Sequence, residues 1–580
     1  MKTSNHTTDA DGAVPTGTRT PENREPGRRR FLTRAGGAAA AAGVLALLLI
    51  TPTAGAKDGP RDGQFHSVLD LLGELRTLDG TSNNLAHPDW GRAGIELLRL
   101  TTTGYSDGAN APGGINRPSP RLISNLVVAQ PGSILNARGA SDFIWQWGQF
   151  VDHDTDLVPT ASPAEPFNIP VPADDPFFDP FNTGTKVIGL NRSVYTVVSG
   201  VRQQVNVLTA YLDASQVYGS DAARSRELRA LDGTGRLKTS AGDLLPFNVN
   251  GIPNGPSGTD PTHFLAGDVR ANEQVGLTAM HTLFVREHNF WADEFHRTFR
   301  HWSDQDIFQM ARAIVASECQ VITFNEWLPV LLGPNAISPY TGYQPHVNAG
   351  IDNVFAAAAF RVGHTLLSPT LARLDKKLRP IPLGHLPLRD SFFNPGAFVQ
   401  SGVDPLLRGL ATQRAQELDN MIVDDVRNFL FGPPGSGGFD LASLNIQRGR
   451  EHGLPSYNQV RADYDLSRKA SFVDVNPDPA VHTRLAAAYA TVDDIDIWVG
   501  ALSESHVPGA MLGDTLFTIL KDQFERLRDG DRFWYQHYLP HSLQELVEEQ
   551  TLAKIIRRNT SIRGEISDNV FVVPHRRDRD

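Results

Sequence analysis

The sequence predicts a mainly α-helical protein with one large domain, long loops and few short strands. Apolar residues recur at helical spacing in several long stretches, whereas the alternating pattern typical of strands is rare and short. Segments rich in Pro, Gly and Asp separate these stretches and indicate long loops at 157–182, 248–260 and 432–438. After Ala56 there is no internal repeat and no obvious linker, so a single domain over 57–580 is expected.

Residues 1–56 have the composition of a tail and an export signal. Residues 1–27 are polar and contain Pro and Gly, which predicts disorder. Residues 28–56 combine an arginine cluster followed by Phe and Leu, an apolar run and a small-residue end, and resemble a twin-arginine export signal. The apolar run is shorter than the roughly 20 residues of a membrane span. We therefore expect an exported protein, secreted or in the cell envelope, without a stable membrane span after signal removal; an uncleaved anchor is the alternative.

The composition excludes several classes of function. The chain has 580 residues, a net charge of −11 and no Lys/Arg-rich patch after the N-terminus, which predicts no nucleic-acid partner. Its one cysteine, Cys319, excludes an intrachain disulfide framework and thiolate metal clusters, and its apolar surroundings predict a buried thiol. Neither GxGxxG nor GxxxxGK[ST] is present, so no nucleotide-binding loop is visible.

Three long stretches predict the main helices, and one short stretch predicts strands. Helical periodicity runs through 273–299, 304–332 and 513–535, the last with an expected helix end near Gly530. Residues 196–207 alternate in the manner of a strand.

The stretch "WGQFVDHDTD" (147–156) places a histidine between two aspartates, close behind a glutamine. If it is helical, Gln149, Asp152 and His153 share one face, and Asp154 points about 100° away. One helical turn would then serve two sites at once. The alternative is a solvated acidic turn.

Four further segments carry polar residues at regular spacing. "LTAYLDASQVYGSD" (208–221) places oxygen-bearing residues at alternate positions, a pattern typical of a calcium loop, although a turn built by Asp and Ser explains it as well. The others are "AGDVRANEQ", "FRVGHTLLSPTLARLD" and "LNIQRGREHGLPSYN". Each contains two polar residues three positions apart: Arg270 and Glu273, Arg361 and His364, and Asn445 and Arg448.

In this order, the five segments resemble the animal-type haem peroxidases of the peroxidase–cyclooxygenase superfamily, in the form of a peroxidasin-like bacterial member. The resemblance extends from about Arg76 to Val573 and includes "RTLDGTSNNLAHPDWG", "RAIVASECQVITFNEWLPVLLG" and "IIRRNTSI". It implies one haem-peroxidase domain that binds haem b and calcium and uses hydrogen peroxide with small anionic or aromatic reductants.

The resemblance also implies roles for individual residues. His153 matches the distal histidine that moves the peroxide proton, Arg270 the distal arginine, and Gln149 the glutamine that holds water or halide. The matches for haem binding are the proximal iron ligand His364, its hydrogen-bond acceptor Asn445, the arginines Arg361 and Arg448 near the propionates and proximal pocket, and the ester-forming carboxylates Asp152 and Glu273. The matches for calcium are Asp154, Thr209, Tyr211 through its carbonyl, Asp213 and Ser215.

The chain departs from this family at two kinds of position. Gln274 stands where myeloperoxidase has the methionine that bonds to haem, and glutamine has no thioether for that link. Ser82 and Arg557 stand where animal members often carry cysteines.

The expected activity is oxidation of bromide, iodide and thiocyanate in preference to chloride, or of small aromatic donors. A fatty-acid dioxygenase is one alternative, but it uses a tyrosine just before the proximal histidine, where this chain reads "FRVGH". A haem-free adhesion protein on the same scaffold is the other. The physiological reductant, the oligomeric state, the extent of covalent haem attachment and signal cleavage stay undecided by the sequence.

Overall fold

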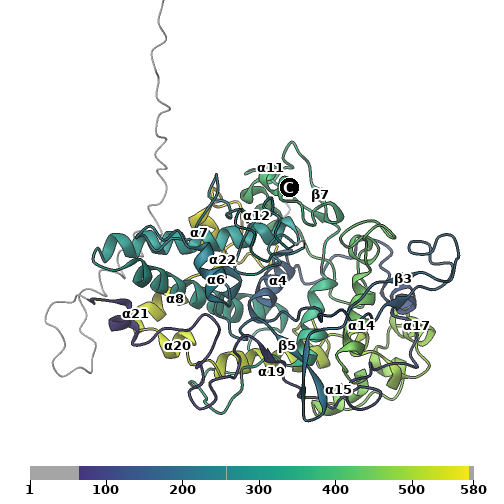
Figure 1. Cartoon of the computed structure of the whole chain (residues 1–580). Helices are drawn as coiled ribbons and strands as arrows, with labels where there is room; N and C mark the ends of the chain where they lie inside the picture. Colours follow the sequence, from purple (N-terminus) through teal and green to yellow (C-terminus); the bar gives the residue numbers. More distant parts are fainter. Residues whose placement is uncertain (1–64, 257, 574–580) are drawn as a thin grey trace, which may run out of the picture.

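The computed structural model describes residues 65–256 and 258–573. The predicted tail and export signal therefore lie outside the described residues. Within the described part, helices dominate and the strands are short (Figure 1), which confirms the predicted fold class. No helix of this part is long and apolar enough to cross a bilayer.

The longer helices, of ten residues or more, carry most of the apolar core. They are α4 (Phe143–Thr155), α7 (Val275–Thr298), α8 (Asp304–Ile322), α12 (Val403–Thr412), α14 (Leu441–Glu451), α17 (Pro479–Ala488) and α19 (Asp514–Asp529).

Shorter helices and turns connect the longer ones. The α-helices are α2 (Val68–Leu72), α3 (Pro120–Ile123), α5 (Ser215–Tyr218), α6 (Ala222–Leu228), α9 (Leu328–Leu331), α10 (Asn353–Ala357), α11 (Pro395–Ser401), α13 (Asp424–Arg427), α15 (Tyr457–Asp463), α16 (Phe472–Val475), α18 (Ile497–Ser503), α20 (Tyr535–Tyr538), α21 (His541–Glu548) and α22 (Leu552–Asn559). The π-helical turns are η1 (Ser124–Val128) and η2 (Thr323–Trp327), and the 3₁₀ turns are η3 (Ala359–His364), η4 (Leu388–Asp390) and η5 (Val492–Asp494).

The described strands pair in three small antiparallel sheets, ordered β1-β5-β4, β2-β3 and β6-β7. They are β1 (Ile95–Glu96), β2 (Ile169–Pro170), β3 (Val187–Ile188), β4 (Tyr195–Val198), β5 (Val201–Asn206), β6 (Thr370–Leu371) and β7 (Leu386–Pro387). The strand-like stretch 196–207 is the hairpin β4–β5, in which Val198 pairs with Val201.

The three predicted long helices are present, with local causes for their ends. The side chain of Gln274 caps α7, and Ser303 and Asp306 form a capping box at the start of α8. The predicted helix 304–332 is not one continuous α-helix, because α8 is followed by the π-helical turn η2 and then by α9. Helix α19 ends at Asp529, directly before Gly530, as predicted.

The core joins α4 to α7 and to the C-terminal part of the chain. Trp147 of α4 contacts the rings of Phe150, Phe284 and Phe571. Helices α7 and α8 pack side by side (Figure 1), and Cys319 of α8 is a buried free thiol, as predicted. Truncating a ring in such a core, as in Phe284→Ala, costs about 3–5 kcal/mol of stability.

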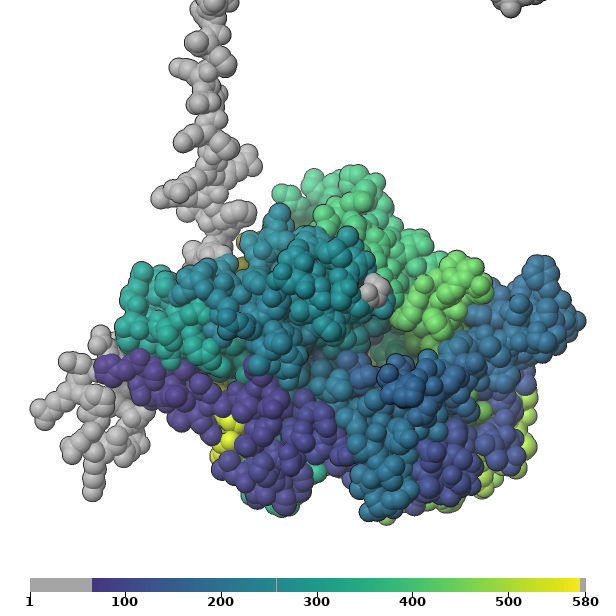
Figure 2. Space-filling model, in the orientation of Figure 1, coloured from purple at the N-terminus to yellow at the C-terminus, as the bar shows by residue number. Residues whose placement is uncertain are grey.

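The N-terminal described segment lies against the C-terminal part of the domain. Asp531 accepts hydrogen bonds from Arg76 at 2.7 Å and from Asn83 at 2.7 Å. Figure 2 shows this N-terminal segment, in purple, along one edge of the surface beside yellow C-terminal residues. Chain segments more than 400 positions apart are thereby tied together.

Helix α4 is the element that gathers the predicted site. It packs against α5, α7 and the turn η3. The segments around His153, Ser215, Arg270 and His364, which are far apart in the sequence, therefore meet around this one helix.

Candidate active site

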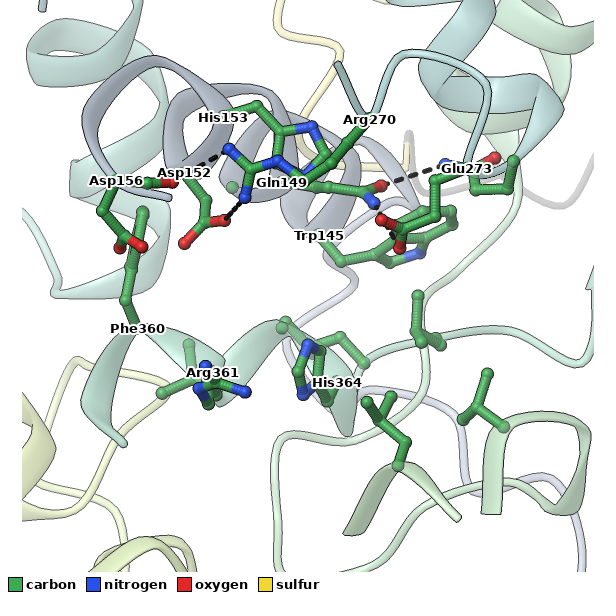
Figure 3. A pocket seen from close by; sticks show the side chains of 18 of the residues that line it. Trp145, Gln149, Asp152, His153, Asp156, Arg270, Glu273, Phe360, Arg361 and His364 are labelled. Atoms are coloured by element: carbon green, nitrogen blue, oxygen red, sulfur yellow. Dashed lines mark hydrogen bonds and ion pairs between the residues drawn. The ribbon is translucent and has the colours of Figure 1, made fainter. Parts of the chain in front are cut away.

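A cavity of ≈ 300 Å³ lies between α4 and η3. Small-molecule sites in proteins begin at about this size. Among the residues that line it are Gln149, Asp152, His153, Arg270, Glu273, Arg361, His364 and Arg448. Figure 3 shows two facing groups, with Gln149, Asp152, His153, Arg270 and Glu273 on one wall and Arg361 and His364 on the other. We call these the distal and proximal walls; Asn445 lies behind His364.

Helix α4 positions three side chains of the distal wall. The helix contains Gln149, Asp152 and His153, and all three line the cavity, which confirms that they share one helix face. Gln149 donates a hydrogen bond to Glu273 at 3.1 Å. This bond links α4 to the segment that precedes α7.

Arg270 is held by acceptors on three sides. Its Nε and Nη2 donate to Asp268 at 2.9 and 3.0 Å, its Nη1 donates to Asp152 at 3.3 Å, and its Nη2 donates to the Asp156 carbonyl at 2.9 Å. Burial lowers the pKa of Arg270, but the Asp268 carboxylate more than offsets this and raises it. The guanidinium is therefore a permanent, oriented cation.

Asp268 is a buried partner of Arg270 that the sequence reasoning did not single out. It lies in the segment "AGDVRANEQ", two positions before Arg270, and is 1% exposed. Burial raises its pKa, but the charge of Arg270 and of a protonated His153 lowers it well below the usual range. The signal in the sequence was the close spacing of acid and arginine, which by itself is too common to decide a role.

His153 is 3% exposed, and its Nδ1 lies 3.5 Å from the Asp268 carboxylate without forming a hydrogen bond. Burial and the nearby charge of Arg270 lower the pKa of His153 well below 6.5. The imidazole is therefore neutral at neutral pH and free to accept a proton.

Burial raises the pKa of two carboxyl groups of the distal wall. Burial raises the pKa of Glu273 to about 7, with Arg270 opposing and Asp152 reinforcing the shift. Burial likewise raises the pKa of Asp152, against the charges of Arg270 and Arg361. The cavity thus presents two carboxyl groups that give up their protons reluctantly.

Gln274 lines the cavity and also caps the start of α7. Its side chain donates to Gln146 at 2.6 Å and to Gln149 at 3.1 Å, and accepts from the Gly276 amide at 2.6 Å. A Cβ at Gly276 would lie 2.6 Å from the Gln146 oxygen and 2.8 Å from the Gln274 oxygen, so a larger residue there would displace these amides. Gln274 is therefore fixed in place by this amide cluster.

On the proximal wall, His364 ends the turn η3. Its Nδ1 lies 2.8 Å from the Asn445 amide nitrogen, while the Asn445 oxygen accepts from Arg361 at 3.0 Å. In this placement the Asn445 NH2 group donates to His364 Nδ1, so the predicted acceptor role of Asn445 would require its amide oxygen to face the ring instead. Burial and the Arg361 charge lower the pKa of His364 to about 3, so the ring is neutral, as a metal-ligating imidazole must be.

Arg361 and Arg448 bring positive charge to the cavity. Burial lowers the pKa of Arg361, and the charge of Arg448 lowers it further. Arg448 donates to Ser193 at 2.8 Å and to Glu451 at 2.9 Å. Two guanidinium groups lining one cavity suit a ligand with carboxylate groups.

The predicted calcium residues also come together, on the far side of α4. The Asp154 carboxylate accepts from the amides of Ala214 at 3.1 Å and Ser215 at 2.5 Å, and the Ser215 hydroxyl donates to the Asp154 carbonyl at 2.7 Å. The Thr209 hydroxyl donates to Asp213 at 3.1 Å. Ala214 has φ = 61°, a left-handed conformation uncommon outside glycine and frequent in functional loops.

Two acids of this loop are buried, and Arg312 lies 3.7 Å from one of them, Asp213. Burial raises the pKa of Asp154 well above its usual value, and the neighbouring Asp213 adds to the shift. Burial also raises the pKa of Asp213, whose Oδ2 is buried without a hydrogen-bond partner. Two buried acids beside hydroxyl and carbonyl oxygens fit a hard cation. The described residues contain no group of three or more His, Cys, Asp or Glu side chains that could hold a metal, so neutral oxygens would have to complete the shell.

Tyr211 contributes to this loop through its backbone. Its carbonyl accepts from the Asp213 amide at 2.9 Å, and its hydroxyl donates to the Trp90 carbonyl at 2.7 Å. The Tyr211 side chain thus holds the loop at Trp90, and the carbonyl is the Tyr211 oxygen that a cation could bind.

Comparison with known proteins places these features in a family. The family model "Animal haem peroxidase" matches residues 75–571. The peroxidasin homolog of Mus musculus is 37% identical over 563 residues, which cover 87% of this chain and 38% of that protein. The chain thus spans well under half the length of this relative.

Solved structures support the same assignment. Peroxidase A from Dictyostelium discoideum has a TM-score of 0.81 and 35% identity, covering 86% of this chain and 99% of that one. Fatty acid alpha-dioxygenase from Oryza sativa has a TM-score of 0.73 and 20% identity, covering 92% of each chain. At 20% identity this second likeness concerns the fold alone.

Proposed function

The chain belongs to the animal haem peroxidase family, and from this premise we propose that it is a haem-dependent peroxidase that uses hydrogen peroxide to oxidise small anions or small aromatic donors. One observation carries the proposal. A single cavity has a neutral histidine, His364, on one wall and a neutral histidine with a fixed cation, His153 and Arg270, on the other.

The residues of the cavity fit a haem. His364 is neutral, and its Nδ1 is engaged by Asn445, which leaves Nε2 as the nitrogen for an iron ligand. Arg361 and Arg448 suit the two propionates. When bound, the haem would supply a redox-active iron ligated by His364 and open to peroxide on the distal side.

His153 and Arg270 then act on the peroxide. His153 Nδ1 faces Asp268, so its Nε2 would take the proton from hydrogen peroxide and return it to the departing oxygen. Arg270 would stabilise the negative charge that grows on that oxygen. Gln149, held by Glu273, would place water or an anion beside them.

Asp152 and Glu273 would form ester links to the haem. Both line the cavity, and burial raises the pKa of both, which favours the neutral carboxyl form. Formation of an ester removes the negative charge of a carboxylate. Where burial already disfavours that charge, its removal costs little electrostatic stabilisation. Denatured protein is expected to retain haem after incubation with peroxide.

A calcium ion held by Asp154, Thr209, the Tyr211 carbonyl, Asp213 and Ser215 would balance the buried acids of the loop. Asp154 follows His153 directly, so this ion would fix the helix end that carries the distal histidine. The ion would thereby couple metal binding to catalytic geometry.

The preferred anions are expected to be bromide, iodide and thiocyanate. Gln274 cannot form the positively charged sulfonium bond that withdraws electrons from the haem, and chloride is the hardest of these anions to oxidise. Steady-state rates with each anion, measured side by side at pH 7, test the preference. Chloride oxidation as fast as bromide oxidation would show that Gln274 does not set this limit.

The dioxygenase alternative is weaker at the level of single residues. None of the described residues that line the cavity is a tyrosine, so a tyrosyl radical facing the substrate has no obvious source. The haem-free adhesion alternative is tested by the absorption spectrum of purified, haem-loaded protein, in which a Soret band is expected. Export through residues 28–56 is tested by fractionating cells that express the full chain.

A further inference from the structure

Two oxidisable aromatic side chains line the described part of the cavity. They are the indoles of Trp145 and Trp327, 2% exposed each, and neither tyrosine nor methionine lines it beside them. Figure 3 shows the Trp145 ring on the cavity wall. Indoles and phenols are the side chains from which one electron is most easily removed, so these two rings are the candidates for oxidation by a strong oxidant formed in the cavity.

The two indoles differ in what accepts their N–H proton. Trp145 donates its N–H to the carboxylate of Asp142 at 3.0 Å. Trp327 donates its N–H to the backbone carbonyl of Ile144 at 2.7 Å. Removing an electron from an indole makes its N–H strongly acidic. A carboxylate can take that proton and stabilise the positive charge, whereas an amide carbonyl can do neither well.

Asp142 is suited to such a proton transfer by its surroundings. It is 1% exposed, and its Oδ1 also accepts a hydrogen bond from Ser368 at 2.8 Å. Burial raises its pKa to about 7, against these hydrogen bonds. The protonated and ionised forms of Asp142 are therefore close in free energy near neutral pH.

We propose that Trp145 is a redox-active residue that supplies one of the two electrons taken up by hydrogen peroxide, while Asp142 receives its N–H proton. The inference rests on the proposed peroxidase function. Hydrogen peroxide takes two electrons and two solvent protons and leaves as two waters. One electron comes from the bound haem and one from the indole, which leaves an indolyl radical and protonated Asp142.

The cycle closes with one-electron donors. A phenol or aromatic amine gives one electron to the indolyl radical and releases its own proton to solvent, while Asp142 returns its proton to the indole nitrogen. A second donor molecule returns the electron taken from the haem. Two donors are oxidised for each peroxide, so electrons and protons balance.

The packing of Trp145 confines the radical to the cavity. Trp147 and Trp327 each contact other aromatic rings, such as Phe150 and Phe360. No ring among the described residues is paired with Trp145 in this way, so a ring-to-ring path away from the cavity is missing. The donor must therefore reach the cavity itself, which favours small aromatic molecules.

Electron paramagnetic resonance of the haem-loaded enzyme, frozen after mixing with hydrogen peroxide, tests the proposal. Protein labelled with ring-deuterated tryptophan identifies an indolyl radical by its altered hyperfine pattern. We expect Trp145→Phe to lower the radical yield by about tenfold or more at equal haem content, and Trp327→Phe to leave it within about twofold. Equal yields in wild type and Trp145→Phe, or loss of the signal in Trp327→Phe alone, would overturn the assignment.

The role of Asp142 is tested by a second matched pair. Asp142→Asn keeps an acceptor for the indole but removes the proton acceptor, and should lower the radical yield by about tenfold. Ser368→Ala removes the other hydrogen bond to Asp142 and leaves the carboxylate, so the radical should persist. An unchanged yield in Asp142→Asn would refute the proton transfer.

Activity separates this inference from the proposed function. Trp145→Phe should slow oxidation of a phenol several-fold more than oxidation of iodide, which removes two electrons at once. If wild type consumes peroxide and oxidises iodide but forms no indolyl radical, only the present inference fails. If wild type with bound haem does not cleave peroxide at all, the peroxidase function fails.

Discussion

On the distal wall, Arg270 donates hydrogen bonds to Asp268, Asp152 and the Asp156 carbonyl, whereas on the proximal wall His364 has one hydrogen-bond partner among the described side chains, Asn445. The distal residues lie on helix α4 and in the segment that precedes α7. The proximal histidine ends a short 3₁₀ turn. Contacts within the chain therefore fix Arg270, whereas the proposed haem would give His364 its second partner.

This difference separates two kinds of effect. Substitutions on the proximal wall should change how much haem the protein holds. Substitutions of His153 or Arg270 on the distal wall should change how fast bound haem and peroxide react, because these two side chains are the ones proposed to act on the peroxide.

The largest effect is expected for His364→Ala. It removes the iron ligand, so most haem should be lost, or haem should remain without peroxidase turnover. Haem content, measured from the absorption of a pyridine complex, and turnover with iodide are the measurements. His541→Ala, at a largely exposed histidine, is the matched control and should change neither. Normal haem content together with normal turnover in His364→Ala would remove the assignment.

His153→Ala should keep its haem and slow peroxide cleavage by roughly 10² or more, the usual scale for lost acid–base help. Stopped-flow absorbance at the haem band after mixing with peroxide gives this rate. A rate equal to wild type would contradict the role of His153.

The pH dependence of the peroxide-cleavage rate also tests the role of His153. Burial and Arg270 lower the pKa of His153 well below 6.5, so its basic form persists as the pH falls from 7 through 6.5. The wild-type rate should therefore stay flat across this window. Arg270→Gln removes one cause of the low pKa, so its acid limb should move to higher pH. An acid limb centred at 6.5 in wild type would mean that the His153 pKa is not lowered.

Asn445→Ala and Asp268→Asn form a matched pair, because each removes the main partner of one wall's central side chain. Asn445→Ala should weaken haem retention by about 10–100-fold, the typical cost of losing such a partner. Asp268→Asn should leave haem retention unchanged and slow peroxide cleavage about tenfold, because Arg270 loses charged acceptors. Haem titration and stopped-flow rates on both variants decide the matter; the reverse pattern would show that the two walls do not differ as described.

The smallest effect concerns Asp154, which touches neither wall directly. Asp154→Ala should lower the calcium content. It should also lower the free energy of unfolding by about 2–3 kcal/mol, the scale of losing a well-bound ligand, and slow peroxide cleavage only several-fold. Elemental analysis and thermal unfolding with and without a chelator are the measurements. Asp568→Ala, at an exposed carboxylate, is the control. Folded wild type without calcium would end the calcium proposal.

Much of the site was predictable because helical spacing is a local property. The order Gln149, Asp152, His153 places three side chains on one face of any α-helix, and α4 is that helix. Thr209, Asp213 and Ser215, which are predicted to bind calcium, belong to one short loop, so their proximity also follows from the local chain. Residues such as Asp268 were missed because an acid near an arginine is common in sequences and acquires its meaning only from burial.

The sequence by itself determined the helical class, the ends of α7 and α19, and the shared helix face of Gln149, Asp152 and His153, since propensity, capping and periodicity act over a few neighbouring residues. Only the tertiary structure decided that His364 faces His153 across one cavity and that Trp145 and Trp327 lie in its wall. It also set the pKa values of the buried acids and histidines. Those properties depend on desolvation and on charges from distant segments, which no local pattern records.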